Sequence, residues 1–267
     1  MTIDVVAERL GCSTSKVSRI ETGQNAASPL DVQRILDIYG VNDSTKMELV
    51  QIAREARQKG WWHPYSAVLA GAYVGLETAA RSIRMYEQQL VPGLLQSEEY
   101  AIAMIRAARL DDTDREIERR VRVRMERQAL LIQDDPIDLR VVLDEAVLSR
   151  PVGGHAVMRD QLIRLVEAAR SPNVTLQILP FAAGAHAGMD GAFVILEFEE
   201  EGDADVVFID NATGGLFLEK ADELRKYISI FDTTRAAALP PEASIEMIEM
   251  LVEEPLWKSK RRVSGSS

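Results

Sequence analysis

The stretch from Ala7 to Gly23, AERLGCSTSKVSRIETG, constrains the fold most, because it predicts two short helices around a tight turn. Apolar residues before Gly11 recur at helical spacing. Gly11 then ends the first helix, since glycine readily takes the left-handed conformation that a sharp exit requires. Ser13 follows as an N-cap that can accept hydrogen bonds from the free amides of the next helix. We expect that second helix to run from Thr14 to Thr22.

The outward side of the second helix is polar. Val17 and Ile20 are three residues apart and form its inner face, so the other side chains point away from the hairpin. Serine and threonine can bond phosphates or base edges, and arginine can make a bidentate contact to guanine. The pattern predicts a DNA-binding surface that consists of Ser13, Thr14, Ser15, Lys16, Ser18 and Arg19. An ordinary helical hairpin is the alternative.

The hairpin resembles the helix-turn-helix of the Xre, or phage-repressor-like, family of bacterial transcriptional regulators. Ala7, Gly11, Val17 and Ile20 fit the spacing of that family, and VSRIETG is close to its commonest sequence. The resemblance implies a five-helix DNA-binding domain with one helix before the hairpin. Almost nothing precedes the hairpin in this sequence, so we expect either that this first helix is missing or that something else covers the exposed core, and we expect the domain to be less stable by itself.

Length and composition are those of an ordinary globular protein. The 267 residues allow about two domains, and 46% of the residues are hydrophobic. The sequence has no run of eighteen apolar residues and no basic-then-apolar N-terminal signal, which predicts a cytoplasmic protein without a membrane partner. The one cysteine, Cys12, excludes an intramolecular disulfide and a multi-cysteine zinc site.

The net charge of −11 is unevenly distributed. Residues 1–60 hold eight Lys or Arg and eight Asp or Glu, so the whole negative excess falls on the rest of the chain. Attraction to phosphate must then be local and modest, and DNA binding should weaken steeply with salt. An acidic second domain would also discourage unspecific DNA binding.

Residues 1–60 predict four helices in all. Ser28-Pro29 is typical of a helix start, and this third helix should end near Gly40. Thr45 and Glu48 fit a capping box that opens a fourth helix, which should stop at Gly60.

A domain boundary is predicted at Gly60–Tyr65, GWWHPY, because a glycine stop is followed by an aromatic cluster and a proline. We therefore expect a helix-turn-helix domain at residues 1–60, an α+β regulatory or interaction domain at 61–254, and a disordered basic tail at 255–267.

The second domain predicts helices followed by a small mixed sheet. The expected helices are Leu76–Leu90, one that starts at Gln96-Ser97, Asp114–Gln133, Met158–Ala169, Glu219–Ala238 and Glu242–Glu253. The expected strands are Ile137–Leu143, Val174–Leu179, Ala192–Phe198 and Val206–Ile209. The helix between the first two strands favours parallel pairing, and the acidic loop Glu199–Asp205 suggests a hairpin between the last two. The fold class is thus α+β, with an all-α domain preceding it.

The helix at Asp114–Gln133 carries the densest basic run of the chain. The interleaved Glu116, Glu118 and Glu126 favour a solvated, ion-paired face, and a second nucleic-acid surface is the alternative.

Five sequence blocks occur in order in this domain. They are VPGLLQSEEYA (91–101), RVRVRMERQ (120–128), LDEAVLSRPVGG (143–154), MRDQL (158–162) and LPFAAGAHAG (179–188). They resemble the uncharacterised C-terminal domain of antitoxin-like Xre regulators from high-GC Gram-positive bacteria. The resemblance implies DNA-binding regulators, some in toxin–antitoxin-like pairs or developmental control, often beside a small partner protein. It implies no catalytic residue.

A metal-dependent hydrolase would have to use Asp144, Glu145, His155, His186 and Asp190. Two histidines and a carboxylate can hold a metal, but no helical pair supports this spacing, and adjacent carboxylates on a strand point to opposite faces. We expect no enzyme, cofactor or metal, and instead an ion pair of Glu145 with Arg150 or Arg159.

The glycine-rich loops suggest a further alternative, a small-ligand or peptide-binding cleft near Phe181, Phe193 and Phe217. Aromatic residues in strands are more often core residues.

The sequence therefore predicts a sequence-specific, antitoxin-like transcriptional regulator that binds double-stranded DNA. We expect a homodimer that reads a pseudo-palindrome, with a C-terminal domain that senses a small protein or ligand. The alternative is an antitoxin-like sequestering module that binds proteins and has lost DNA binding.

Overall fold

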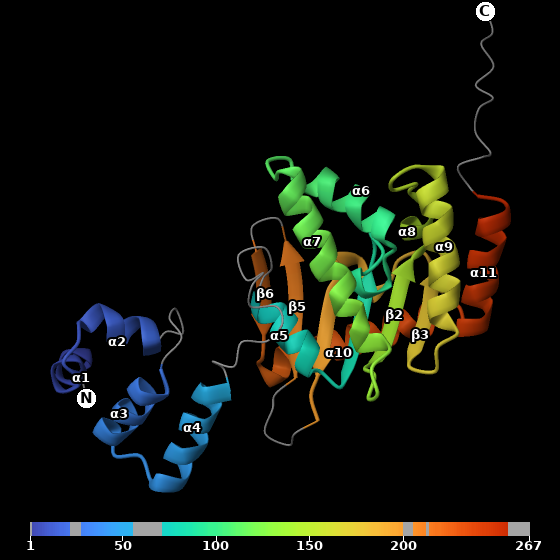
Figure 1. Ribbon diagram of the computed structural model, residues 1–267. Coiled ribbons are helices and arrows are strands. Elements are labelled where there is room, and N and C mark those ends of the chain that lie inside the picture. Colours follow the sequence, from blue (N-terminus) through green and yellow to red (C-terminus); the bar gives the residue numbers. More distant parts are fainter. Residues whose placement is uncertain (1, 22–27, 56–70, 200–204, 212–213, 256–267) are drawn as a thin grey trace, which may run out of the picture. The chain divides into compact units, whose positions relative to one another are not determined.

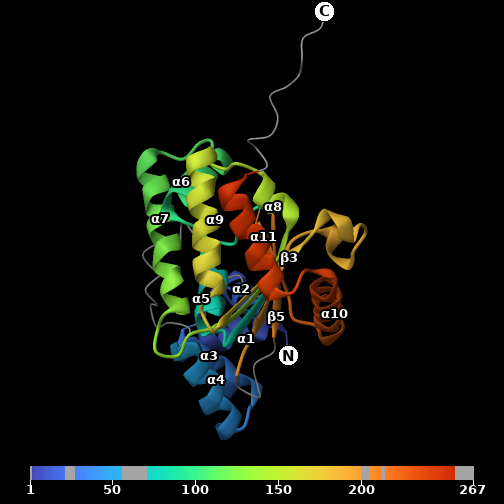
Figure 2. The ribbon, with the colours of Figure 1, turned by 90° about the vertical axis from the view of Figure 1, so that its right-hand side faces the viewer.

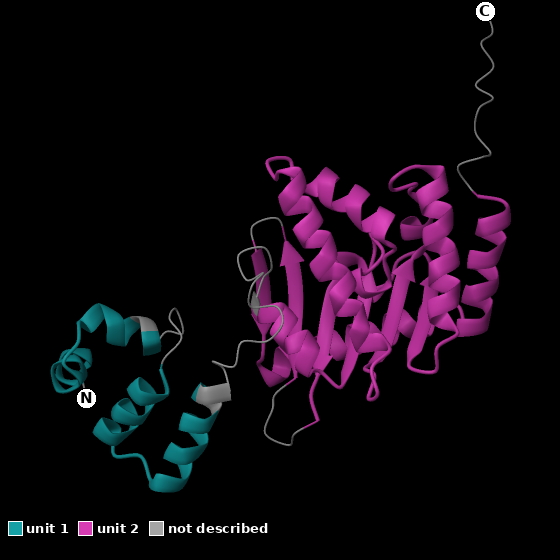
Figure 3. Ribbon diagram, in the orientation of Figure 1, with its two compact units in different colours: residues 1–63 teal, residues 64–267 magenta. Residues whose placement is uncertain are grey.

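The chain forms two compact units, residues 1–63 and 64–267 (Figure 3). The computed structural model describes residues 2–21, 28–55, 71–199, 205–211 and 214–255. The predicted boundary segment Gly60–Tyr65 and the predicted tail from residue 256 onward lie outside the described residues.

Unit 1 consists of helices in its described part. They are α1 (Ile3–Leu10), α2 (Thr14–Glu21), α3 (Pro29–Tyr39) and α4 (Asp43–Glu55). A small core joins the first three, in which buried Val6, Ala7 and Val17 pack with half-buried side chains that include Ile38 of α3. The predicted capping of α3 is confirmed, because Ser28 Oγ accepts a 2.9 Å hydrogen bond from the Asp31 amide.

The predicted start of α4 is wrong by three residues, because the capping box places the N-cap at Thr45. The helix begins at Asp43, and Asn42 Oδ1 accepts a 2.9 Å hydrogen bond from the Thr45 amide. Asn42 is therefore the N-cap, and Thr45 already lies in the first turn. Asparagine is as good a cap as threonine and occurs earlier in the chain, so the Thr45 capping box does not form. The predicted end at Gly60 lies outside the described residues.

Unit 2 combines helices with one sheet (Figure 1). In chain order its elements are α5 (Gly71–Ala79), β1 (Ser82–Glu87), the 3₁₀ turn η2 (Gly93–Leu95), α6 (Glu98–Ala108), α7 (Asp114–Arg127), η3 (Gln128–Leu131), β2 (Asp138–Asp144), α8 (Glu145–Ser149), α9 (His155–Ala169), β3 (Val174–Leu179), η4 (Phe181–Ala183), η5 (Ala187–Asp190), β4 (Phe193–Glu197), β5 (Val206–Asn211), β6 (Gly214–Leu218), α10 (Ala221–Ala237) and α11 (Pro241–Glu253). The α+β class is confirmed.

The sheet has six described strands in the order β3-β2-β1-β4-β5-β6. Strands β1, β2 and β3 are parallel, and β4, β5 and β6 continue the sheet by antiparallel pairing. The parallel pair β2–β3 around α9 and the hairpin β4–β5 were both predicted and are confirmed. This order places β1 and β4 at the centre of the sheet, and β1 has parallel β2 on one side and antiparallel β4 on the other.

The predicted helix Leu76–Leu90 is wrong, because α5 ends at Ala79 and the chain then forms β1. Ile83 and Met85 are buried on one face of the sheet, while Tyr86 is buried on the other. A strand that is buried on both faces has apolar residues at mixed spacings, which imitate helical periodicity.

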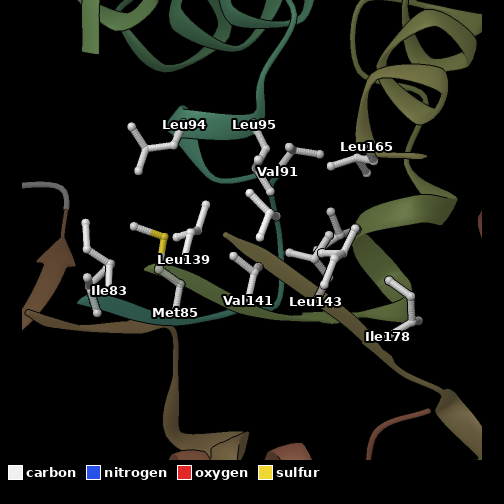
Figure 4. Packing of buried hydrophobic residues seen from close by; sticks show 14 of the residues in the cluster. Ile83, Met85, Val91, Leu94, Leu95, Leu139, Val141, Leu143, Leu165 and Ile178 are labelled. Carbon is white, nitrogen blue, oxygen red and sulfur yellow. The ribbon is translucent and has the colours of Figure 1, made fainter. Parts of the chain in front are cut away.

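The two faces of the sheet have different coverings (Figure 2). The first face packs against η2, α9 and α11 through residues that include Ile83, Met85, Leu139, Val141, Leu143 and Ile178 (Figure 4). The second face packs against α10 through Tyr86, Val142, Phe193, Ile195, Val207 and Phe231. In the described chain a single long helix thus covers the second face, so loops at its edge have room to form a site.

The predicted solvated face of the arginine-rich helix is wrong for two side chains. Arg127 is buried against Glu77, and the mostly covered Arg124 donates a 2.8 Å hydrogen bond to Gln96 Oε1. The α-helix also ends at Arg127 and continues as η3 instead of reaching Gln133. The partners of these arginines are distant in sequence, so the interleaved glutamates gave no indication of them.

Candidate nucleic-acid interface

The turn between α1 and α2 has the predicted geometry. Gly11 adopts the left-handed conformation (φ 66°), and the Cys12 amide donates a 3.0 Å hydrogen bond to the Ala7 carbonyl. Ser13 Oγ accepts a 3.3 Å hydrogen bond from the Lys16 amide and caps the second helix. These contacts fix the angle at which α2 leaves the turn.

The core of unit 1 determines which side of α2 faces outward. Val17 is fully buried, whereas Ser13, Thr14 and Ser15 are exposed and Ser18 is half-buried. These hydroxyl side chains lie at the N-terminal half of α2, where the helix dipole favours anions such as phosphate. The side chain of Arg19, the sixth predicted contact, lies outside the described part of the structure.

The predicted contacts share a shallow hollow with α1. Thr14, Ser15 and Ser18 line it together with Ile3 and Asp4. Hydroxyls suit phosphate oxygens and base edges, but the Asp4 carboxylate lies beside them and opposes a phosphate. The arrangement therefore favours hydrogen-bonding contacts over strong charge neutralisation at this end of the surface.

Lys16, another predicted contact residue, forms an ion pair within unit 1. Its Nζ lies 3.0 Å from Asp31 Oδ1 of α3, and its side chain is 44% exposed. The hydrogen bond from Lys16 holds the pKa of Asp31 below its usual value, against the effect of burial. Lys16 thus ties α2 to α3, and a phosphate would have to compete with Asp31 for it.

A second contact between α2 and α3 was not predicted. The Tyr39 hydroxyl donates a hydrogen bond to the Glu21 carboxylate, and this bond raises the pKa of Tyr39. Both residues are exposed helix-end positions, which give no periodic signal in the sequence. Together with the Lys16 pair, this bond holds both ends of α2 against α3.

The candidate metal-binding residues of unit 2 do not converge. Among the described residues, no group of three or more His, Cys, Asp or Glu side chains could hold a metal ion. His186 Nε2 lies 4.0 Å from Asp144 Oδ2, whereas His155 begins α9 and Asp190 ends η5, and both are exposed. Asp144 instead caps α8 by accepting a 2.8 Å hydrogen bond from the Ala146 amide.

The predicted ion pair of Glu145 with Arg150 or Arg159 is also wrong. Glu145 Oε2 accepts a 2.8 Å hydrogen bond from the Phe181 amide. The carboxyl ends of β2 and β3 are adjacent in the parallel sheet, so the loop after β3 reaches Glu145 first.

The geometry defines a protein with a helix-turn-helix unit and a separate, larger α+β unit. A family model described as Helix-turn-helix domain matches residues 1–49, and one described as Domain of unknown function (DUF5753) matches residues 70–250. The chain therefore belongs to the DUF5753 family, and its helix-turn-helix domain indicates a DNA-binding regulator. No curated protein matches the sequence. Within the described residues, no helix combines the length and apolar character needed to cross a membrane.

Proposed function

We propose that this protein is a sequence-specific transcriptional regulator that reads DNA with α2. The observation that carries this proposal is the exposure of Ser13, Thr14 and Ser15 on a helix whose opposite side is anchored by buried Val17. Phosphate contacts would position the helix, and hydrogen bonds from the hydroxyls and from Arg19 would read base edges.

The finer features of the proposal are those of an antitoxin-like Xre regulator. A single helix-turn-helix reads only one half-site, so we propose a homodimer on a pseudo-palindrome. We further propose that unit 2 receives a signal from a small partner protein or a ligand. Its separation as a compact unit and the negative charge of its sequence support a role other than DNA contact.

The test is DNA binding by the full chain across salt concentrations. Fluorescence anisotropy with DNA from upstream of its own gene should show sequence preference and an affinity that falls steeply with salt. Arg19→Ala should lose about tenfold in affinity, the value of one good base contact. Arg34→Ala, an exposed arginine on α3, is the matched control. Equal binding by wild type and Arg19→Ala, or no sequence preference, would overturn the proposal.

Two contacts favour a second candidate, a sequestering module that binds a small protein and not DNA. Asp31 forms an ion pair with Lys16, and Asp4 lies beside the hydroxyls of α2. The outward surface of α2 therefore has less positive potential than its sequence suggests. This candidate predicts co-purification of a small protein encoded nearby, together with no DNA binding at low salt.

A further inference from the structure

The loop between β3 and β4 closes the second face of the sheet at the carboxyl end of the parallel strands. Its turn η5 packs against α10, and the two lie together on that side of the sheet (Figure 2). Ligands of open α/β sheets bind outside the carboxyl ends of the strands, where the direction of the connections changes. In this sheet that place is β1, between parallel β2 and antiparallel β4.

A cavity of about 130 Å³ lies between η5, the sheet and α10. Its apolar walls are Phe193, Ile209, Tyr227 and Ile230. The rings of Phe193 and Tyr227 meet edge to face with centroids 5.0 Å apart, and Phe193 is only 3% exposed. An apolar cavity of roughly 150 Å³ is enough to hold a benzene-sized group. The space thus suits a compact apolar group and excludes a large ligand.

Two opposite charges lie at the mouth of this cavity. Asp190 belongs to η5 and Lys226 to α10, so they approach the opening from different elements. Both residues are exposed, whereas Phe193 at the wall is buried, which places the charges toward solvent and the apolar surface inside. The site therefore offers one carboxylate, one ammonium group and a small apolar interior.

Tyr86 of β1 holds the loop between β3 and β4 in position. A Cβ at Gly188 would lie 2.7 Å from Tyr86 Cε1, so only glycine allows the loop to pack on that ring. His186 Nδ1 accepts a 3.2 Å hydrogen bond from the Gly188 amide, and its ring meets Tyr86 edge-on. A cavity whose walls are fixed before binding loses less entropy when a ligand enters.

We propose that this cavity binds a small zwitterion of the α-amino-acid type with a compact apolar side chain. Lys226 pairs with the ligand carboxylate, Asp190 pairs with its ammonium group, and the side chain packs against Phe193 and Tyr227. The inference rests on the proposed signal-receiving role of unit 2 and names the ligand class for it.

The test uses the full chain and ligand-detected NMR titrations with three probes of nearly equal size. Leucine carries both charges, leucinamide lacks the carboxylate, and 4-methylpentanoate lacks the ammonium group. Leucine should bind with a Kd at or below about 1 mM, as suits so small a ligand. Each of the other probes should bind about fivefold more weakly, since each loses one ion pair near the surface.

Variants assign each charge to its partner. Lys226→Gln should weaken leucine binding about fivefold and abolish the preference over leucinamide, while the preference over 4-methylpentanoate remains. Asp190→Asn should show the reverse pattern. Arg225→Gln and Asp134→Asn are matched controls, because both residues are exposed and lie outside the cavity lining.

Three results would overturn the inference: no leucine binding at about 10 mM, equal affinity for the three probes, or the same effect from the controls. Gly188→Ala gives an additional check, since displacement of the loop should weaken leucine binding. DNA binding is measured separately. A failure to bind leucine would therefore leave the proposal of a DNA-binding regulator intact, and leucine binding without DNA binding would refute only the DNA-binding proposal.

Discussion

Glu77 and Arg127 form a buried, bidentate ion pair in which both hydrogen bonds measure 2.6 Å. The Glu77 side chain is fully buried and that of Arg127 is 9% exposed. Tyr73 donates a 3.0 Å hydrogen bond to the same carboxylate, and the Arg127 guanidinium carbon lies 5.4 Å from the centre of the Tyr73 ring. This cluster attaches α5, the first described element of unit 2, to α7.

Glu77→Gln should destabilise the protein by about 3–5 kcal/mol, because it leaves the buried Arg127 without a counter-charge. Urea denaturation followed by circular dichroism measures the loss. The control is Glu199→Gln, which removes an exposed ion pair with Arg81 and should cost less than about 1 kcal/mol. Similar losses in the two variants would contradict the importance of the buried pair.

Stability should depend on pH through Glu87. Burial and, to a smaller extent, the charge of Asp210 raise the pKa of Glu87 to about 8, against the opposing charge of Arg124. In the unfolded chain the same group ionises near 4.5. Between these pH values the folded state holds a proton that the unfolded state has released, so stability falls as pH rises from 4.5 to 8.

Glu87→Gln should remove this part of the pH dependence, because glutamine does not titrate. The unfolding temperature measured across that pH range is the readout, and Glu118→Gln, at an exposed position of α7, should behave as the wild type. An unchanged slope in Glu87→Gln would mean that other groups determine the pH dependence.

Gly11→Ala should weaken the helix-turn-helix unit by about 1–2 kcal/mol, because a side chain in the left-handed conformation is strained. The added Cβ meets no atom within 4 Å, so the cost is conformational and not steric. Gly11→Asn should lose less, since asparagine tolerates this conformation better. Hydrogen exchange of α1 and α2 amides would distinguish the two, and an equal loss in both would indicate a clash instead.

Asp31→Asn should release Lys16 for a phosphate contact. The slope of log affinity against log salt should then steepen by about 0.9 for that added contact. Asp37→Asn is the control, because Asp37 lies on the same helix and pairs with Lys46 at 2.8 Å. Anisotropy titrations at several salt concentrations give the slopes. A change of similar size in the control would show that net charge alone is responsible.

Features that depend on local chemistry could be predicted from the sequence. The left-handed Gly11, the Ser13 cap and the Ser28 cap each follow from residues within one turn of the chain, and all three are present. Strand β3 was predicted at its observed bounds, because its short β-branched and apolar run is enclosed by turn residues. The outward position of Thr14 and Ser15 follows in the same way from the burial of Val17.

Features that depend on distant residues could not be predicted. Strand β1 was missed because burial on both faces removes the alternation that marks a strand. Strand β6 was missed because its sequence begins with two glycines, which are uncommon in strands. Glycine is required at position 215 because a Cβ there would lie 1.9 Å from the Phe208 ring. The pairing of Lys16 with Asp31 was not predicted either, because the two residues belong to different helices.

The aromatic cleft that the sequence suggests as an alternative forms only in part, for the same reason. Phe193 lines the cavity beneath η5, but Phe181 is 59% exposed and Phe217 packs on Phe208 at the first face. Proximity in the sequence does not determine which face of the sheet an aromatic ring occupies. The residues that complete the cavity, Tyr227 and Ile230, come from a helix that follows all the strands.

The central position of β1 has a consequence for synthesis. Its parallel partner β2 is the next strand to be synthesised. Its other neighbour, β4, follows about a hundred residues after β1, and at 5–20 residues per second the ribosome needs roughly 5–20 s to reach it. During that interval the nascent chain carries an open strand edge with apolar side chains on both faces. The half-built sheet is therefore the stage at which this protein most needs a chaperone, and destabilised variants should aggregate there first.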